Sequence, residues 1–134
     1  MAEIAPPPAP IAADAPLTAE IARYVAQADK GRSAFNDAYV RADRAAKTAS
    51  GAAVSSDAWV AAQVAISALE AARNDSVSAL ASLDTLYVQR SNAIADGRER
   101  GGLAEIDTAR AATLAMVDSQ NDRIDAMKGR LAQP

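Results

Sequence analysis

The fold of this chain is decided by residues 17–49, which read LTAEIARYVAQADKGRSAFNDAYVRADRAAKTA. Alternating steps of four and three residues along this stretch meet an apolar residue or glycine at every position: Leu17, Ile21, Tyr24, Ala28, Gly31, Phe35, Ala38, Ala42, Ala45 and Ala49. This spacing is typical of a helix that packs against other helices along a narrow seam. It predicts a long helix from about residue 15 to residue 50.

The same spacing predicts two further helices, over about residues 56–96 and 103–131. Their seams are interrupted by polar residues, at Arg73, Ser76, Arg90, Arg110, Thr113 and Gln120. The expected fold is all-α, with three long alanine-rich antiparallel helices that form a bundle or an extended hairpin with a third helix. Gly31 and the pair Asn74-Asp75 are the weak points, because breaks at both would give four or five shorter helices.

The ends of the predicted helices carry recognisable capping residues. Asp14 and Ser55 suit the N-caps of the first two helices, and a staple between Val54 and Trp59 would support the second. Gly51 and Gly97 stand where a helix ends in a left-handed residue. Residues 1–14 are rich in alanine and contain four prolines, so they are expected to form an extended tether. This leaves residues 15–134 as one helical domain.

The first residues of the chain give a prediction of its cellular compartment. Met1 is followed closely by Glu3 and three prolines, which differs from a signal peptide. We expect a periplasmic or secreted chain whose leader was replaced by a start methionine, with a cytoplasmic protein as the alternative.

The composition indicates a thin core. Alanine contributes 36 of the 134 residues, and the larger aliphatic residues are few. Because alanine buries less apolar area than leucine at each contact, a domain of this size is expected to gain stability from a partner or a second copy.

The residue types present argue against several function classes. The chain has no cysteine and no histidine, which removes the thiolate nucleophile and the commonest general base and metal ligand, so we expect no enzyme activity and no cofactor or metal. A net charge of −3 argues against nucleic-acid binding. The longest uncharged helical stretch, residues 58–69, is too short to span a bilayer.

The loop lengths predict how the helices overlap. Folding the chain about the middle of each loop places residue i of the first helix beside 106 − i of the second, and residue i of the third beside 199 − i. Gly31 should then lie near Asp75, and residues 56–67 should be covered by the first helix alone. This overhang would expose an apolar surface that contains Tyr39, Val40, Trp59, Val60 and Val64, a predicted interface for a protein partner or a homodimer.

The polar residues of the seam predict a second site. The same pairing places Arg73 and Ser76 opposite Ser33 and Lys30, near Asp29. We expect Arg73 to pair with a carboxylate, either in a polar layer that fixes the helix register or in a pocket for a small ligand. The leading hypothesis for the function is a non-enzymatic structural or interaction module that uses the surface around Trp59. A small-ligand or sensor bundle that uses the layer around Arg73 is the alternative.

Overall fold

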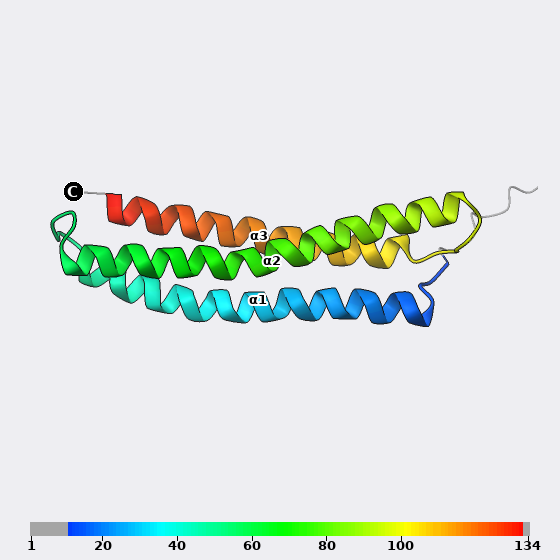
Figure 1. The fold of residues 1–134 in the computed structure, drawn as a ribbon, viewed down its shortest axis with the longest axis horizontal. Helices are drawn as coiled ribbons and strands as arrows, with labels where there is room; N and C mark the ends of the chain where they lie inside the picture. Colours follow the sequence, from blue (N-terminus) through cyan, green and yellow to red (C-terminus); the bar gives the residue numbers. More distant parts are fainter. Residues whose placement is uncertain (1–10, 133–134) are drawn as a thin grey trace, which may run out of the picture.

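The computed structural model describes residues 11–132, and these residues form three helices without a strand (Figure 1). The helices are α1 (Ala15–Thr48), α2 (Asp57–Ala95) and α3 (Leu103–Ala132). Each runs antiparallel to the one before it, so the molecule is long and narrow (Figure 1). The all-α prediction is confirmed, and neither α1 at Gly31 nor α2 at Asn74-Asp75 is broken. Residues 1–10 of the predicted tether lie outside the described part of the chain.

The register of α1 against α2 follows the prediction. Gly31 is buried, and a methyl group in place of its hydrogen would lie 2.9 Å from Ser76 Oγ, 3.0 Å from Ser76 N and 3.2 Å from Asp75 Cβ. The backbone of α1 at Gly31 therefore lies directly against Ser76 and Asp75 of α2. A larger residue at position 31 would push α2 away.

Capping interactions fix the helix ends. Asp14 accepts the Leu17 N–H at 2.9 Å as predicted. The N-cap of α2 is Ser56 rather than the predicted Ser55, because Ser55 turns the chain with a φ of 70° and it is the Ser56 hydroxyl that accepts the Trp59 N–H. At the end of α2, Gly97 has a φ of 74°, and the Arg98 N–H donates to Ala93 O in a Schellman motif.

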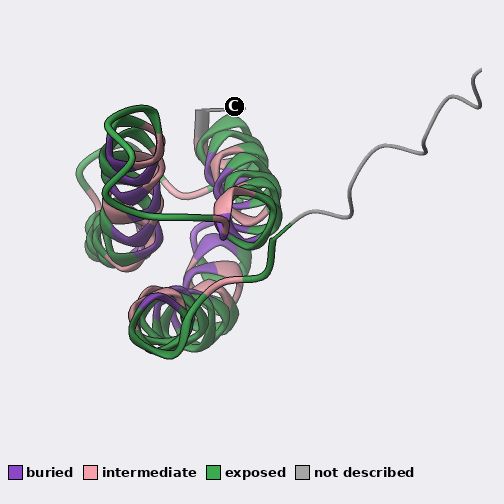
Figure 2. Ribbon diagram, turned by 90° about the vertical axis from the view of Figure 1, so that its right-hand side faces the viewer, coloured by how far each residue is buried: buried purple, intermediate pink, exposed green. Residues whose placement is uncertain are grey.

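The core is split into two apolar clusters. One, around Phe35, Ile66, Leu69, Ile124 and Met127, lies towards the loop between α1 and α2. The other, around Leu17, Leu86 and Ile106, lies at the opposite end. Buried residues face the neighbouring helices, whereas the outward sides are exposed (Figure 2). Ser76, Thr113 and Gln120, which are all buried, come from the stretches between the two clusters.

The predicted overhang of α2 is shortened by about five residues, because α3 extends further along α2 than the loop rule placed it (Figure 1). Arg110 Nε binds Asp84 at 2.8 Å and Arg73 Nη1 binds Asn121 at 2.6 Å, each about five residues from the predicted partner. Leu131 lines the same cleft as Trp59. The loop rule failed because extended residues cover about twice the length of helical ones, and residues 98–102 run back along α2 before α3 begins.

The close contact at Gly31 gives a direct test. Gly31→Val should lower the free energy of unfolding by about 1–3 kcal/mol, because the side chain must displace the α2 backbone near Ser76. The matched control is Gly129→Val, since a Cβ at Gly129 of α3 would meet no atom within 4 Å. That variant should change stability by less than about 0.5 kcal/mol. Equal effects of the two substitutions in urea unfolding would contradict the close contact.

Candidate functional site

The five residues of the predicted interface do not form one surface. Trp59 is half-buried beside Val54 and Leu131, and Tyr39 is half-buried against Phe35, with Arg123 of α3 5.4 Å from its ring centroid. The valines among them are exposed, with Val40 on α1 and both Val60 and Val64 on α2. The aromatic residues thus belong to the bundle's own packing, and only the valines stay available to a partner.

The predicted polar layer is present in part. Ser76 is completely buried and donates weakly to Met116 Sδ at 3.7 Å. Arg73 is half-buried, but its hydrogen bonds go to the side-chain oxygens of Asn121 and Asn74 and not to a carboxylate as expected. Asp29 does not join the layer, because it is exposed and pairs with Arg32 on its own helix. The displaced α3 explains the difference, since it presents Asn121 to Arg73.

Gln120 of α3 is a buried polar residue that interrupts the apolar spacing of its helix. Its side chain is 3% exposed, and neither its amide nitrogen nor its amide oxygen has a hydrogen-bond partner. A buried amide without partners costs stability, so this residue weakens the middle of the core. The interruption of the apolar spacing was the signal that could have identified it.

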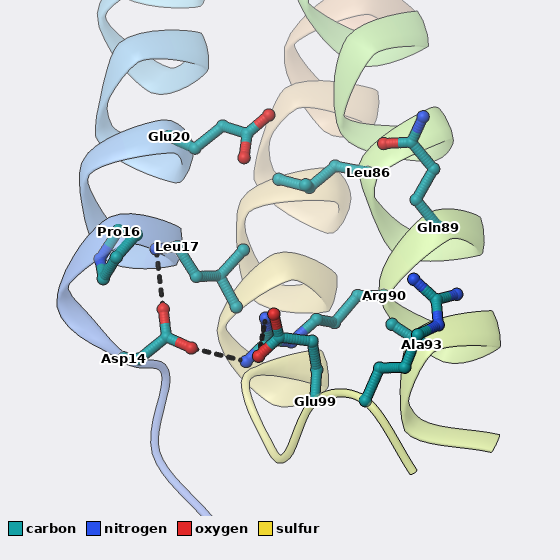
Figure 3. Close-up of a pocket in the computed structure, with 10 residues that line it drawn as sticks. Asp14, Pro16, Leu17, Glu20, Leu86, Gln89, Arg90, Ala93 and Glu99 are labelled. Atoms are coloured by element: carbon teal, nitrogen blue, oxygen red, sulfur yellow. Dashed lines mark hydrogen bonds and ion pairs between the residues drawn. The ribbon is translucent and has the colours of Figure 1, made fainter. Parts of the chain in front are cut away.

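The buried arginine of this protein is Arg90, near the end of α2, and not Arg73. Its side chain is 8% exposed and binds both backbone and carboxylate oxygens (Figure 3). Nε donates to Gly101 O at 2.9 Å, and Nη2 donates to Arg100 O at 2.8 Å and to Asp14 Oδ2 at 2.9 Å. Glu99 adds an ion pair at 3.3 Å. Arg90 therefore joins the start of α1 to the loop between α2 and α3.

A cleft of about 330 Å³ opens beside Arg90, lined by Asp14, Leu17, Glu20, Gln89, Arg98 and Glu99 among others (Figure 3). Hydrogen bonds lower the pKa of Asp14, first from the Leu17 N–H and then from Arg90. Arg90 donates three hydrogen bonds to oxygen atoms of the chain, and Glu99 Oε2 lies 3.3 Å from its Nη1, so its charge is already balanced by Asp14 and Glu99. Its arrangement serves to hold the helices together.

Residues 11–13 also belong to this end of the molecule. The Gly102 N–H donates to Ile11 O at 3.1 Å, and the Ala13 N–H donates to Glu105 Oε1 at 3.4 Å. A Cβ on Gly101 would collide with Ile11, and one on Gly102 would collide with Leu17. The last residues of the predicted tether are therefore packed onto the loop that follows α2.

The outward side of α2 carries fewer charged residues than the outward sides of α1 and α3. Between Ala58 and Ala95, a range that the structure describes completely, Asp75 is the one charged residue that is exposed without reservation. The side chains of Asp84 and Glu70 are 50% and 36% exposed, and they pair with Arg110 and Lys128 of α3. By contrast, the exposed residues of α1 include the charged side chains Arg23, Asp29, Lys30, Arg32, Asp37, Arg41, Arg44 and Lys47. Those of α3 include Glu105, Asp107, Asp118, Asp122, Arg123, Asp125, Lys128 and Arg130.

We call this surface the α2 outer face and define it by three rows of residues. The central row repeats every seven residues and consists of Val64, Ala71, Ser78, Thr85 and Asn92. The row beside α3 consists of Val60, Ser67, Asn74, Ala81 and Val88, and the row beside α1 of Ala61, Ala68, Asp75 and Gln89. Asp75 is thus at the edge of the face, next to Gly31 of α1.

Comparison with known proteins finds no family model, curated protein or solved structure that matches the chain. Within residues 11–132, no group of three or more acidic side chains is placed to hold a metal ion. None of the three helices, over the residues described, has a segment apolar enough to cross a membrane. The α2 outer face is the candidate surface, because its exposed residues are small or uncharged along most of the helix.

The orphaned amide of Gln120 leads to a prediction about stability. Gln120→Met should raise the free energy of unfolding by about 1–3 kcal/mol, because it replaces an unpaired buried amide by an apolar group of similar size. Gln27→Met, at an exposed position of α1, is the control and should change stability by less than about 0.5 kcal/mol. A loss of stability at position 120 in chemical unfolding would show that the amide has a partner.

The ion pair of Asp14 predicts a dependence on pH. Because the pKa of Asp14 is lowered in the folded state, its ionised form stabilises the fold above the ordinary pKa of an aspartate, and this contribution disappears as the pH falls through the lowered value. Asp14→Asn, which keeps a capping side chain, should therefore be less stable than wild type near neutral pH. The difference should shrink below about pH 4. Thermal unfolding across this range checks it, and a constant difference would contradict the role of the charge.

Proposed function

We propose that this protein is a non-enzymatic interaction module that packs another helix along the α2 outer face. The observation that carries the proposal is the lack of charge on a helix side that is exposed over its whole length. A helix that faces only water normally has charged or strongly polar residues on its outer side. Between Ala58 and Ala95, the exposed residues of α2 are instead mostly Val, Ala, Ser, Thr, Asn and Gln.

The chemistry of this face suits helix packing. Val60, Val64 and Val88 are 45%, 64% and 57% exposed, so a partner would remove apolar surface from water. The alanines and serines between them are small enough for a second helix to approach closely, and they lose little side-chain entropy on contact. Only Asp75 would need to stay hydrated, and its position at the edge of the face allows this.

This proposal keeps part of the interface that the sequence suggests and moves its centre. Val60 and Val64 remain, whereas Trp59 and Tyr39 pack within the bundle and Val40 belongs to α1. The docking surface is then the side of α2 and not the tip of the bundle. The proposal includes both self-association and the docking of a different helical protein.

The alternative of a small-ligand or sensor bundle has less support. Such a site would need space beside the polar residues in the middle of the core. Gly31 instead lies against Ser76 with no room for an added methyl group, and Arg73 is already bound to Asn121.

Site-specific photo-crosslinking in cells of the source organism tests the proposal. A photoreactive amino acid at Ala71, in the centre of the face, should give discrete protein adducts. The same amino acid at Ala26, an exposed alanine of α1, is the matched control and should give only background. Equal background at both positions would contradict the proposed function. The mass of an adduct identifies what covers the face.

A further inference from the structure

We infer that the helix that covers the α2 outer face is α2 of a second copy of this chain, antiparallel to the first and related to it by a two-fold axis near Ser78. The inference rests on the proposed function, because it names the partner of that same surface. It is carried by the charge distribution of the three helices, by the size of the face and by the position of its single charged residue.

The charge distribution favours a second copy. Binding strips water from both surfaces, so a face without charges pairs at least cost with another face without charges. The exposed sides of α1 and α3 carry charged residues along their lengths, whereas the three rows of the α2 outer face contain one charged residue, Asp75. The carboxylates of Glu70 and Asp84 lie outside these rows and pair with Lys128 and Arg110 of α3. Among the helices of this chain, the α2 outer face is therefore its own best match, and a two-fold pair is the simplest closed assembly.

The size of the face is sufficient for a specific though weak contact. In an antiparallel pair centred on Ser78, residues 61–95 of both copies overlap, which gives a strip about 50 Å long and about 10 Å wide on each copy. The pair then buries on the order of 1,000 Å² in total, at the lower limit for a specific interface. We accordingly expect a dimer whose population depends on protein concentration.

The helix dipoles favour an antiparallel pair, because it sets the N-terminal end of each α2 beside the C-terminal end of the other. Asp75 then decides the register: both Asp75 side chains lie along the same edge of an antiparallel contact, and a pair centred between Asn74 and Asp75 would place the two carboxylates side by side, where they repel each other. The central rows also interlock only when residues spaced by seven meet. An antiparallel pair centred on Ser78 satisfies both conditions, because it places Ala71 opposite Thr85 and separates the two Asp75 residues by about 9 Å along the helix axis.

Light scattering of the purified full chain is the first test. The native mass of the wild type should rise from one copy towards two over a hundredfold range of concentration. Ala71→Arg should remain a single copy because it places charge in the contact, whereas Ala26→Arg on α1 should behave as the wild type. Circular dichroism and thermal unfolding of both variants establish that they are folded. A wild type that remains one copy throughout overturns the inference.

Disulfide formation tests the orientation, and the chain is suited to it because it contains no cysteine. Ser78→Cys should form a disulfide-linked dimer under mild oxidation, since the two-fold axis brings this residue to its own counterpart. Val64→Cys should not, because its counterparts are about 40 Å apart in the antiparallel pair. Ser33→Cys, at an exposed serine of α1, measures the rate of random collisions. Equal crosslinking at Val64 and Ser78 would show a parallel pair and overturn the orientation.

The two sets of experiments separate the failure of this inference from the failure of the proposed function. Photo-adducts at Ala71 with twice the mass of the chain, together with a rising native mass, support both. Adducts of any other mass, with a wild type that remains one copy, overturn the second copy as the partner but leave the docking function in place. Background adducts at Ala71 together with a single-copy wild type overturn both.

Discussion

The contact between Gly31 of α1 and Ser76 of α2 is the constraint on which the rest of the structure depends. It brings two long helices together where neither has a large side chain, and so fixes the register of the first hairpin. Everything on α2 is oriented by this contact: its seam faces α1 and α3, and the α2 outer face is turned to solvent. Because the core contains so much alanine, such close approach is the means by which its helices gain contact area. Because each alanine buries little area, nearly every turn of each helix must contribute contact area, and this requires long helices.

The core is more polar in the middle of the bundle than in the apolar clusters at its two ends. Ser76, Thr113 and Gln120 are buried there, and Gln120 has no hydrogen-bond partner for its amide. The apolar cluster around Phe35 and Leu69 holds one end, and Leu17, Leu86 and Ile106 with the Arg90 network hold the other. Asp43, which binds both Lys47 and Arg130 and has a lowered pKa mainly from Arg130, further ties α1 to α3.

The outer face of α2 connects this thin core to the proposed function. A three-helix bundle with few large apolar residues buries little surface, and a second copy would add apolar contact without any change within the bundle. In the proposed dimer, the two α2 helices lie at the centre of a six-helix assembly, and the charged sides of α1 and α3 remain in water. The distribution of charge over the three helices would then have one cause, which is that α2 is central and the other two helices are peripheral.

The sequence by itself determined the three helices, their seams, the cap at Asp14 and the register of Gly31 against Asp75, because these depend on the local spacing of apolar residues and on one short loop. It could not place α3, since residues 98–102 run back along α2 and their extended path is held by Arg90, a contact between residues ten and eleven positions apart. This displacement gave Arg73 an amide partner instead of a carboxylate, and it brought Leu131 beside the half-buried Trp59. The sequence predicted that Val60 and Val64 are exposed, as they are, but it did not indicate the side of α2 on which they lie. Only the tertiary structure decided which side of α2 is left open, because exposure depends on how two other helices pack against it.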